Sequence, residues 1–135
     1  MAKVLVVEDN PSWKGKYRRD LGDVVGARNI NIADNFKRAL ELVARKDYDA
    51  YVLDGEFPRS PGLPPEQLGI ELAQEISKKE GGFGKVRIAS ASPSTLDEAL
   101  ELGIKYVYSK GLPDRERGYR DFSALKRDLK KDLKI

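Results

Sequence analysis

The sequence contains neither histidine nor cysteine, and each absence excludes a class of chemistry. Without imidazole the chain itself has no histidine base, histidine metal ligand or phosphohistidine. Without a thiol it has no thiolate nucleophile and no disulfide, which fits a reducing compartment. No stretch approaches the ~20 apolar residues that span a membrane, and the apolar run at the N-terminus is too short for a signal peptide. We therefore expect a soluble, cytoplasmic protein whose chemistry depends on carboxylates, hydroxyls, lysine or arginine.

The sequence also lacks a large net charge, because its 25 Lys and Arg residues nearly balance its 22 Asp and Glu residues. The net charge of +3 comes entirely from residues 114–135, which hold eight basic and five acidic residues. A local excess of this kind on a helix is more typical of a solvated face than of a nucleic-acid interface. We expect no nucleic-acid partner and no membrane contact, and one domain that covers residues 1–135.

Short β-branched runs alternate with segments of helical periodicity. The predicted strands lie at 3–7, 29–33, 50–53, 86–89 and 106–109. Helices are predicted after each strand; their expected N-caps are Asn10 before Pro11, Asp34, and Ser92 or Ser94, and the last helix carries an apolar stripe of Phe122, Leu125, Leu129 and Leu133. The pattern predicts an α/β fold, a flavodoxin-like (βα)5 doubly wound parallel sheet with strand order 2-1-3-4-5. Two long irregular segments remain, at 55–66 and 111–121.

Polar residues follow the predicted strands at the carboxyl edge of the sheet, where doubly wound proteins bind ligands. These residues are Glu8, Asp9, Asp54, Ser90 and Lys110. Neighbouring carboxylates repel one another by about 4 kcal/mol at 4 Å and an effective dielectric constant of ~20, unless a cation lies between them. Carboxylate oxygens suit Mg²⁺, which keeps waters and leaves room for a phosphoryl oxygen. The residues therefore predict a magnesium site, with Ser90 and Lys110 placed to hold a phosphoryl group.

Five segments in this order resemble the receiver domain of two-component response regulators. They are Val4-Leu-Val-Val-Glu-Asp-Asn-Pro11, Tyr51-Val-Leu-Asp54, Gly69-Ile-Glu-Leu72, Ile88-Ala-Ser-Ala91 and Tyr106-Val-Tyr-Ser-Lys110. The resemblance implies transfer of a phosphoryl group to Asp54 from the phosphohistidine of a histidine kinase or phosphotransfer protein. It implies signalling through contacts with a downstream protein, with self-phosphorylation and self-dephosphorylation as the only chemistry. By the same resemblance, the Mg²⁺ ligands are Glu8, Asp9, Asp54 and the backbone carbonyl of Glu56, and the phosphoryl oxygens bind Ser90, the Ala91 amide and Lys110.

The sequence departs from the family pattern at three places. The segment 55–66 is longer than the usual loop after the phosphoacceptor. Gly111 stands where the family has a cis-proline, so we expect Lys110 to be aimed differently. Val107 stands at the position of the family's switch aromatic, while Tyr106 and Tyr108 point to the opposite face of the predicted edge strand.

Two other functions fit the same residues. A receiver-like interaction module would keep the fold without cycling phosphate, and a small Mg²⁺-dependent phosphohydrolase would use Asp54 as its nucleophile. The single tryptophan, Trp13, lies near the rim of the predicted site; we expect it to serve mainly as partly buried packing against Tyr17.

Overall fold

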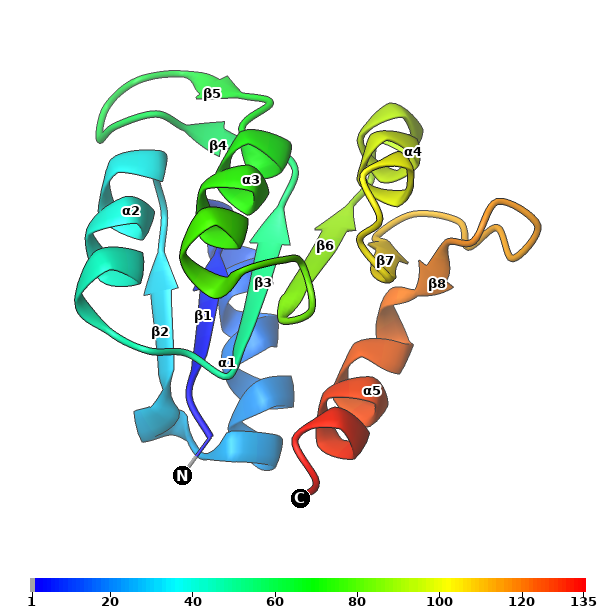
Figure 1. Cartoon of the computed structure of the whole chain (residues 1–135), viewed down its shortest axis with the longest axis horizontal. Coiled ribbons are helices and arrows are strands. Elements are labelled where there is room, and N and C mark those ends of the chain that lie inside the picture. Colours follow the sequence, from blue (N-terminus) through cyan, green and yellow to red (C-terminus); the bar gives the residue numbers. More distant parts are fainter. Residues whose placement is uncertain (1) are drawn as a thin grey trace.

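A parallel sheet forms the centre of the computed structural model, which describes residues 2–135 (Figure 1). Its five longer strands are β1 (Val4–Val7), β2 (Ile30–Ala33), β3 (Ala50–Asp54), β6 (Val86–Ser90) and β7 (Tyr106–Ser109). They lie in the order β2-β1-β3-β6-β7, which confirms the order predicted for the five strands. A short strand, β8 (Arg120–Asp121), follows β7 at that edge.

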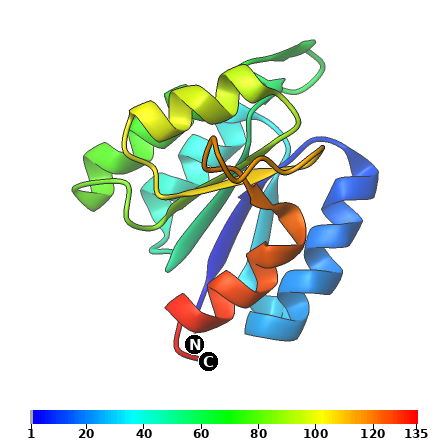
Figure 2. The same cartoon turned by 90° about the vertical axis from the view of Figure 1, so that its right-hand side faces the viewer.

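Helices cover both faces of the sheet (Figure 2). On one face lie α1 (Pro11–Val25) and α5 (Leu125–Asp132); on the other lie α2 (Phe36–Arg45), α3 (Gly69–Glu80) and α4 (Pro93–Glu101). The short helices η1 (Ala27–Asn29) and η2 (Phe122–Ala124) precede β2 and α5. Each helix of residues 2–135 is too short or too polar to cross a bilayer.

The central strand β1 is apolar without interruption because both of its faces are buried. In β1, Val4 and Val6 pack with α1 and α5, whereas Leu5 and Val7 pack with the helices of the other face. All four side chains are fully buried. The two resulting cores hold the carboxyl ends of the strands in fixed positions.

The helix starts agree with the predicted caps at two of three places. The Asn10 side chain accepts hydrogen bonds from the backbone N–H groups of Ser12 (2.9 Å) and Trp13 (3.2 Å), and Pro11 is the first helical residue. Of the two serines weighed for α4, Ser92 is the cap.

Asp34 was the wrong choice of cap for α2. The cap is Asn35, whose side-chain oxygen accepts from the Arg38 N–H at 2.9 Å. The helix begins at Phe36, so the residue next to it takes the cap position, and Asp34 accepts a hydrogen bond from the Asn35 amide instead.

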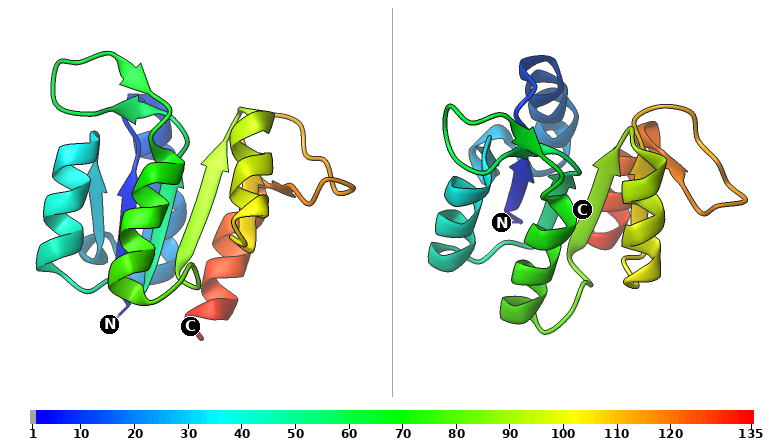
Figure 3. Two further views of the ribbon diagram at one scale, coloured as in Figure 1. Left: turned by 45° about the horizontal axis from the view of Figure 1, so that its top comes forward. Right: turned by 90° about the horizontal axis from the view of Figure 1, so that it is seen from above.

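Both segments predicted to be irregular contain strands (Figure 3). In the first, β4 (Phe57–Pro58) pairs antiparallel with β5 (Pro65–Glu66). Arg59 pairs with Glu66 inside this hairpin (3.7 Å) and ties the hairpin to α3 through an ion pair with Glu71 (3.3 Å).

In the second segment, residues 111–121, a bridge joins Asp114 to Tyr119, and β8 then pairs parallel with β7. Because Tyr108 and Ser109 pair with β8, the carboxyl half of β7 is not a free edge, contrary to the sequence prediction.

Candidate functional site

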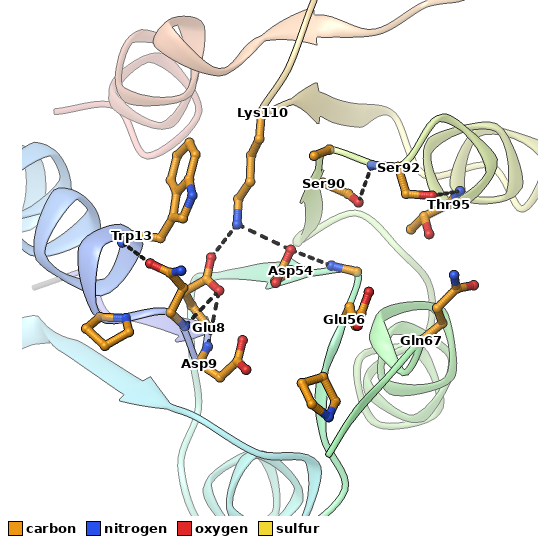
Figure 4. A pocket seen from close by; sticks show the side chains of 15 residues that line it. Glu8, Asp9, Trp13, Asp54, Glu56, Gln67, Ser90, Ser92, Thr95 and Lys110 are labelled. Atoms are coloured by element: carbon orange, nitrogen blue, oxygen red, sulfur yellow. Dashed lines mark hydrogen bonds and ion pairs between the residues drawn. The ribbon is translucent and has the colours of Figure 1, made fainter.

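The carboxyl ends of β1, β3, β6 and β7 open into one pocket of about 670 Å³ (Figure 4). The five side chains singled out from the sequence all line it: Glu8, Asp9, Asp54, Ser90 and Lys110. They come from four different strand ends, because parallel strands direct their carboxyl ends to the same edge. Ala91 and Glu56 line the same pocket.

Three carboxylates form the acidic side of the pocket. Glu8, Asp9 and Asp54 each offer an oxygen, and these oxygens lie within 4.8 Å of one another. Glu8 is only 1% exposed, and its carboxylate accepts from the backbone N–H groups of Asp9 (3.1 Å) and Asn10 (3.3 Å). Asp54, the last residue of β3, accepts from the Gly55 N–H at 2.9 Å. The start of α1 and the end of β3 therefore hold the acids together.

Lys110 is the cation that faces these acids. Its ammonium contacts Glu8 and lies 3.2 Å from Asp54 Oδ1, and its side chain is 6% exposed. The Lys110 N–H donates to the Ser90 carbonyl at 2.9 Å, and the Gly111 N–H donates to Ser109 Oγ at 3.1 Å. Contrary to the expectation based on Gly111, the lysine reaches the acidic cluster, because its backbone continues the pairing of β7 with β6 and the next residue is held by Ser109.

Burial raises the pKa values of two of the three carboxyl groups, Asp54 and Asp9. The pKa of Asp54 is raised to about 7, chiefly because burial removes the carboxyl group from water; Lys110 lowers this pKa and nearby Glu8 raises it. Burial also raises the pKa of Asp9, with Glu8 contributing in the same direction. One ammonium facing three acids leaves negative charge uncompensated. Oxygen ligands from carboxylates are those that Mg²⁺ prefers, so the residues present fit a hard divalent cation.

Hydroxyl and amide groups form the opposite wall. Ser90 is 5% exposed, and its Oγ accepts from the Ser92 N–H at 3.0 Å. Ala91, Ser92 and Thr95 line the pocket beside it. These groups could bind the oxygens of an anion that sits between them and Lys110.

Two glycines allow these elements to approach closely. A Cβ at position 55 would lie 2.9 Å from Ser90 Oγ and 2.8 Å from Thr95 Cγ2. A Cβ at position 69 would lie 2.4 Å from the Asp54 backbone oxygen. Both glycines are therefore required by the close packing of the end of β3 against α3 and α4. In the sequence, Gly55 was only part of a turn signal.

Sequence reasoning missed part of the pocket. Pro65 and Gln67 line it because the β4–β5 hairpin returns to the site, and a hairpin of two-residue strands leaves no periodic signal. Trp13, which the sequence placed near the rim, does line the pocket, beside Lys110. It is half-buried, and its ring lies closer to Phe122 (4.8 Å between centroids) than to Tyr17 (6.4 Å), the partner expected from the sequence.

Tyr119, a further residue that the sequence did not indicate, lies beyond the pocket. Val107 is fully buried on the face covered by α3 and α4, and Tyr108 lies on the opposite face, as predicted. Tyr119, from the segment before β8, is buried on the side of Val107. Its hydroxyl contacts the Asp97 carboxylate and donates to the Pro93 carbonyl at 3.1 Å. An aromatic ring distant in sequence therefore packs against α4, directly after the Ser90 loop.

Comparison with known proteins finds relatives by structure. Neither family models nor curated proteins match the sequence. The response regulator TrrA from Thermotoga maritima, crystallised in complex with Mg²⁺-BeF, is 26% identical, with a TM-score of 0.70 over 98% of this chain and 100% of that chain. The receiver domain of a DNA-binding response regulator from Colwellia psychrerythraea is 17% identical, with a TM-score of 0.74 over 100% of both chains.

A third neighbour is an atypical orphan response regulator described as having a phosphorylation-independent regulatory mechanism. It is 17% identical, with a TM-score of 0.68 over 98% of this chain and 96% of that chain. The likeness to these structures extends over nearly the whole chain.

Proposed function

We propose that this chain, which has the fold of response regulator receiver domains, is a signalling domain that accepts a phosphoryl group on Asp54. The observation that carries the proposal is the position of Asp54 at the pocket's centre. Glu8 and Asp9 lie on one side of it and Ser90 on the other, and the Lys110 ammonium contacts both Asp54 and Glu8 (Figure 4). A carboxylate between a cation site and hydroxyl and ammonium donors is arranged for phosphoryl transfer, which depends on positioning and on neutralising charge.

The donor is a phosphohistidine on another protein, because this chain has no histidine. An Asp54 carboxylate oxygen attacks the phosphorus; the new P–O bond forms as the P–N bond breaks, and the donor's imidazole leaves with a proton from solvent. Ser90, the Ala91 amide and Lys110 hold the oxygens of the transferred group. Water later attacks the phosphorus and breaks the P–O bond, which releases inorganic phosphate and restores the carboxylate.

Glu8, Asp9, Asp54 and the backbone carbonyl of Glu56 are the residues that would hold Mg²⁺. The ion would neutralise negative charge on the carboxylates and on the phosphoryl oxygens. The chain itself supplies one cationic partner for Asp54, the Lys110 ammonium at 3.2 Å. Such partners favour the ionised form of Asp54, whose pKa is raised to about 7.

Phosphorylation is tested with a small acyl-phosphate donor, Mg²⁺ and intact-mass measurement. We expect one added phosphoryl group on the parent chain and none on Asp54→Asn, which removes the nucleophile with little change of shape. Asp47→Asn is the matched control, because Asp47 is 98% exposed and should label as the parent does.

The outcomes separate the three candidate functions. Saturable labelling that decays slowly supports the receiver. Turnover of small phosphate esters in excess of the protein would favour the phosphohydrolase. No labelling of a folded, Mg²⁺-binding chain would favour an interaction module that does not cycle phosphate.

A further inference from the structure

We propose that Trp13 is a positioning residue for Lys110: its indole face binds the ammonium and keeps it near Asp54 when the carboxylates take other partners. The proposal rests on the receiver function proposed above and adds a residue to its machinery. Trp13 touches the reacting groups only through Lys110, so its effect must pass through that lysine.

The geometry places the ammonium over the ring. Lys110 Nζ lies 4.4 Å from the centroid of the Trp13 ring and 5.9 Å from that of Tyr17. Both distances fall within the ~6 Å reach of a cation–π contact, and tryptophan provides the strongest one. Figure 4 shows Trp13 beside the lysine side chain on the wall of the pocket. Since Lys110 is 6% exposed, little water competes with the ring for the ammonium.

Trp13 is held through both its backbone and its ring. Its backbone N–H donates to the Asn10 side chain at 3.2 Å, which fixes the residue in the first turn of α1. Its ring meets the Phe122 ring edge-on at a centroid distance of 4.8 Å, and Phe122 also contacts Tyr17 at 5.4 Å. The ring is therefore a preorganised surface and needs no rearrangement to bind the ammonium.

The need for such a surface follows from the double use of the carboxylates. Lys110 contacts Glu8 and Asp54, and both are proposed ligands of the divalent cation. An ammonium that depends on the same oxygens competes with that cation for them. An indole face attracts an ammonium but offers no lone pair for a hard cation. Trp13 therefore lets Lys110 release carboxylate oxygens and still remain beside Asp54.

A packing role alone makes a different prediction. If Trp13 only filled space between α1 and η2, its truncation would weaken the site whatever residue stood at position 110. The two roles are separated by a double-mutant cycle, because only positioning through Lys110 disappears when the ammonium is gone.

The first measurement is the Mg²⁺-dependent affinity for beryllofluoride of the parent, Trp13→Phe, Trp13→Leu, Lys110→Met and the Trp13→Leu, Lys110→Met double variant. We expect Trp13→Leu to weaken binding about 2- to 30-fold, the range of a single cation–π contact, and Trp13→Phe to retain most of the affinity. In the Lys110→Met background, Trp13→Leu should have no further effect. Lys16→Met is the control: its ammonium also lies near the Trp13 ring, 5.4 Å from the centroid, but Lys16 is not one of the residues that line the pocket, so affinity should be unchanged.

The second measurement needs neither metal nor phosphate mimic. In the parent, ring currents should shift the Lys110 ε-methylene protons upfield in NMR spectra, and Trp13→Leu should abolish the shift. The unfolding equilibrium constants of the parent, Trp13→Leu, Lys110→Met and their double variant should show a coupling of about 2- to 30-fold between positions 13 and 110.

Each result decides the proposal. An equal loss of affinity in the parent and Lys110→Met backgrounds, an unshifted Lys110 signal, or additive unfolding effects would overturn it. If the parent binds no beryllofluoride, the proposed function fails, whereas the NMR signal and the unfolding cycle still establish or refute the positioning of Lys110 by Trp13.

Discussion

Replacing Lys110 by methionine should destabilise the chain strongly, and magnesium should reverse much of the loss. Methionine matches the length of the buried part of the side chain but carries no charge. In the variant, Glu8 and Asp54 face each other without the ammonium that contacts both. Their oxygens lie within 4.8 Å, so the repulsion between two ionised groups amounts to about 3 kcal/mol at an effective dielectric constant of ~20.

Loss of one partner from a buried ion pair typically costs about 3–5 kcal/mol, and we expect a decrease of that size in the free energy of unfolding at pH 8 without metal. Mg²⁺ should then stabilise the variant more than the parent, because no ammonium competes for the carboxylates; each tenfold gain in affinity adds about 1.4 kcal/mol. Urea unfolding followed by circular dichroism, with chelator and with Mg²⁺, measures both effects.

Lys126→Met is the matched control for this experiment. Lys126 also pairs with a carboxylate, Asp23 at 2.9 Å, but their side chains are 45% and 70% exposed. An exposed pair contributes at most about 1 kcal/mol and should not respond to Mg²⁺. Equal losses in the two variants, or the same magnesium response in Lys110→Met and the parent, would refute the view that Lys110 neutralises the acidic cluster.

Three further predictions concern pH, close packing and the contact with α4. The folded chain holds the Asp54 proton more tightly than the unfolded chain, since its pKa is about 7 against 3.8; the stability from that proton is complete below pH 3.8 and is lost as the pH rises through about 7. Without metal, the advantage of Asp54→Asn in free energy of unfolding should therefore grow by about 4 kcal/mol between pH 4 and pH 8, and a constant difference would contradict the raised pKa. Gly69→Ala should lose about 1–3 kcal/mol because its Cβ meets the Asp54 backbone, while Gly22→Ala, with open space around it, should not be destabilised in the same urea titrations. Tyr119→Phe should lose about 1–2 kcal/mol with the hydrogen bonds of its hydroxyl, one of them to Asp97, and an unchanged unfolding midpoint would show that these bonds contribute nothing.

The sheet could be predicted because its signals are local and repeated. Each longer strand is a run of four or five residues, mostly buried except in β2, and each is followed by a helix whose start or stripe can be read from nearby residues. A parallel sheet brings the carboxyl ends of its strands together, so residues as distant as Glu8 and Lys110 could be assigned to one pocket from the sequence alone. Alternation within a strand also placed Val107 and Tyr108 on opposite faces.

The unpredicted features all depend on contacts that the local sequence does not encode. The β4–β5 hairpin pairs only two residues on each side, too few for an alternating pattern. The choice of Asn35 over Asp34 as a cap is a matter of one residue between two good capping side chains. Lys110 reaches the acidic cluster from a backbone that is paired with Ser90 and followed by a Gly111 N–H bonded to Ser109 Oγ, and the residue type at position 111 does not reveal these contacts.

The 111–121 segment brings an aromatic ring to the side of the sheet on which Val107 stands in place of the family's aromatic. Val107 is fully buried, and Tyr119, twelve residues later, packs on the same side of the sheet. Its hydroxyl reaches Pro93 and Asp97, at the start of the helix that follows the Ser90 loop. Because Tyr119 directly precedes β8, movement of the Ser90 loop would act on a ring anchored in the 111–121 segment rather than on a side chain of β7. The buried Tyr119 and the strand β8 thus belong to one continuous segment, whereas the sequence showed only that position 107 carries no aromatic ring.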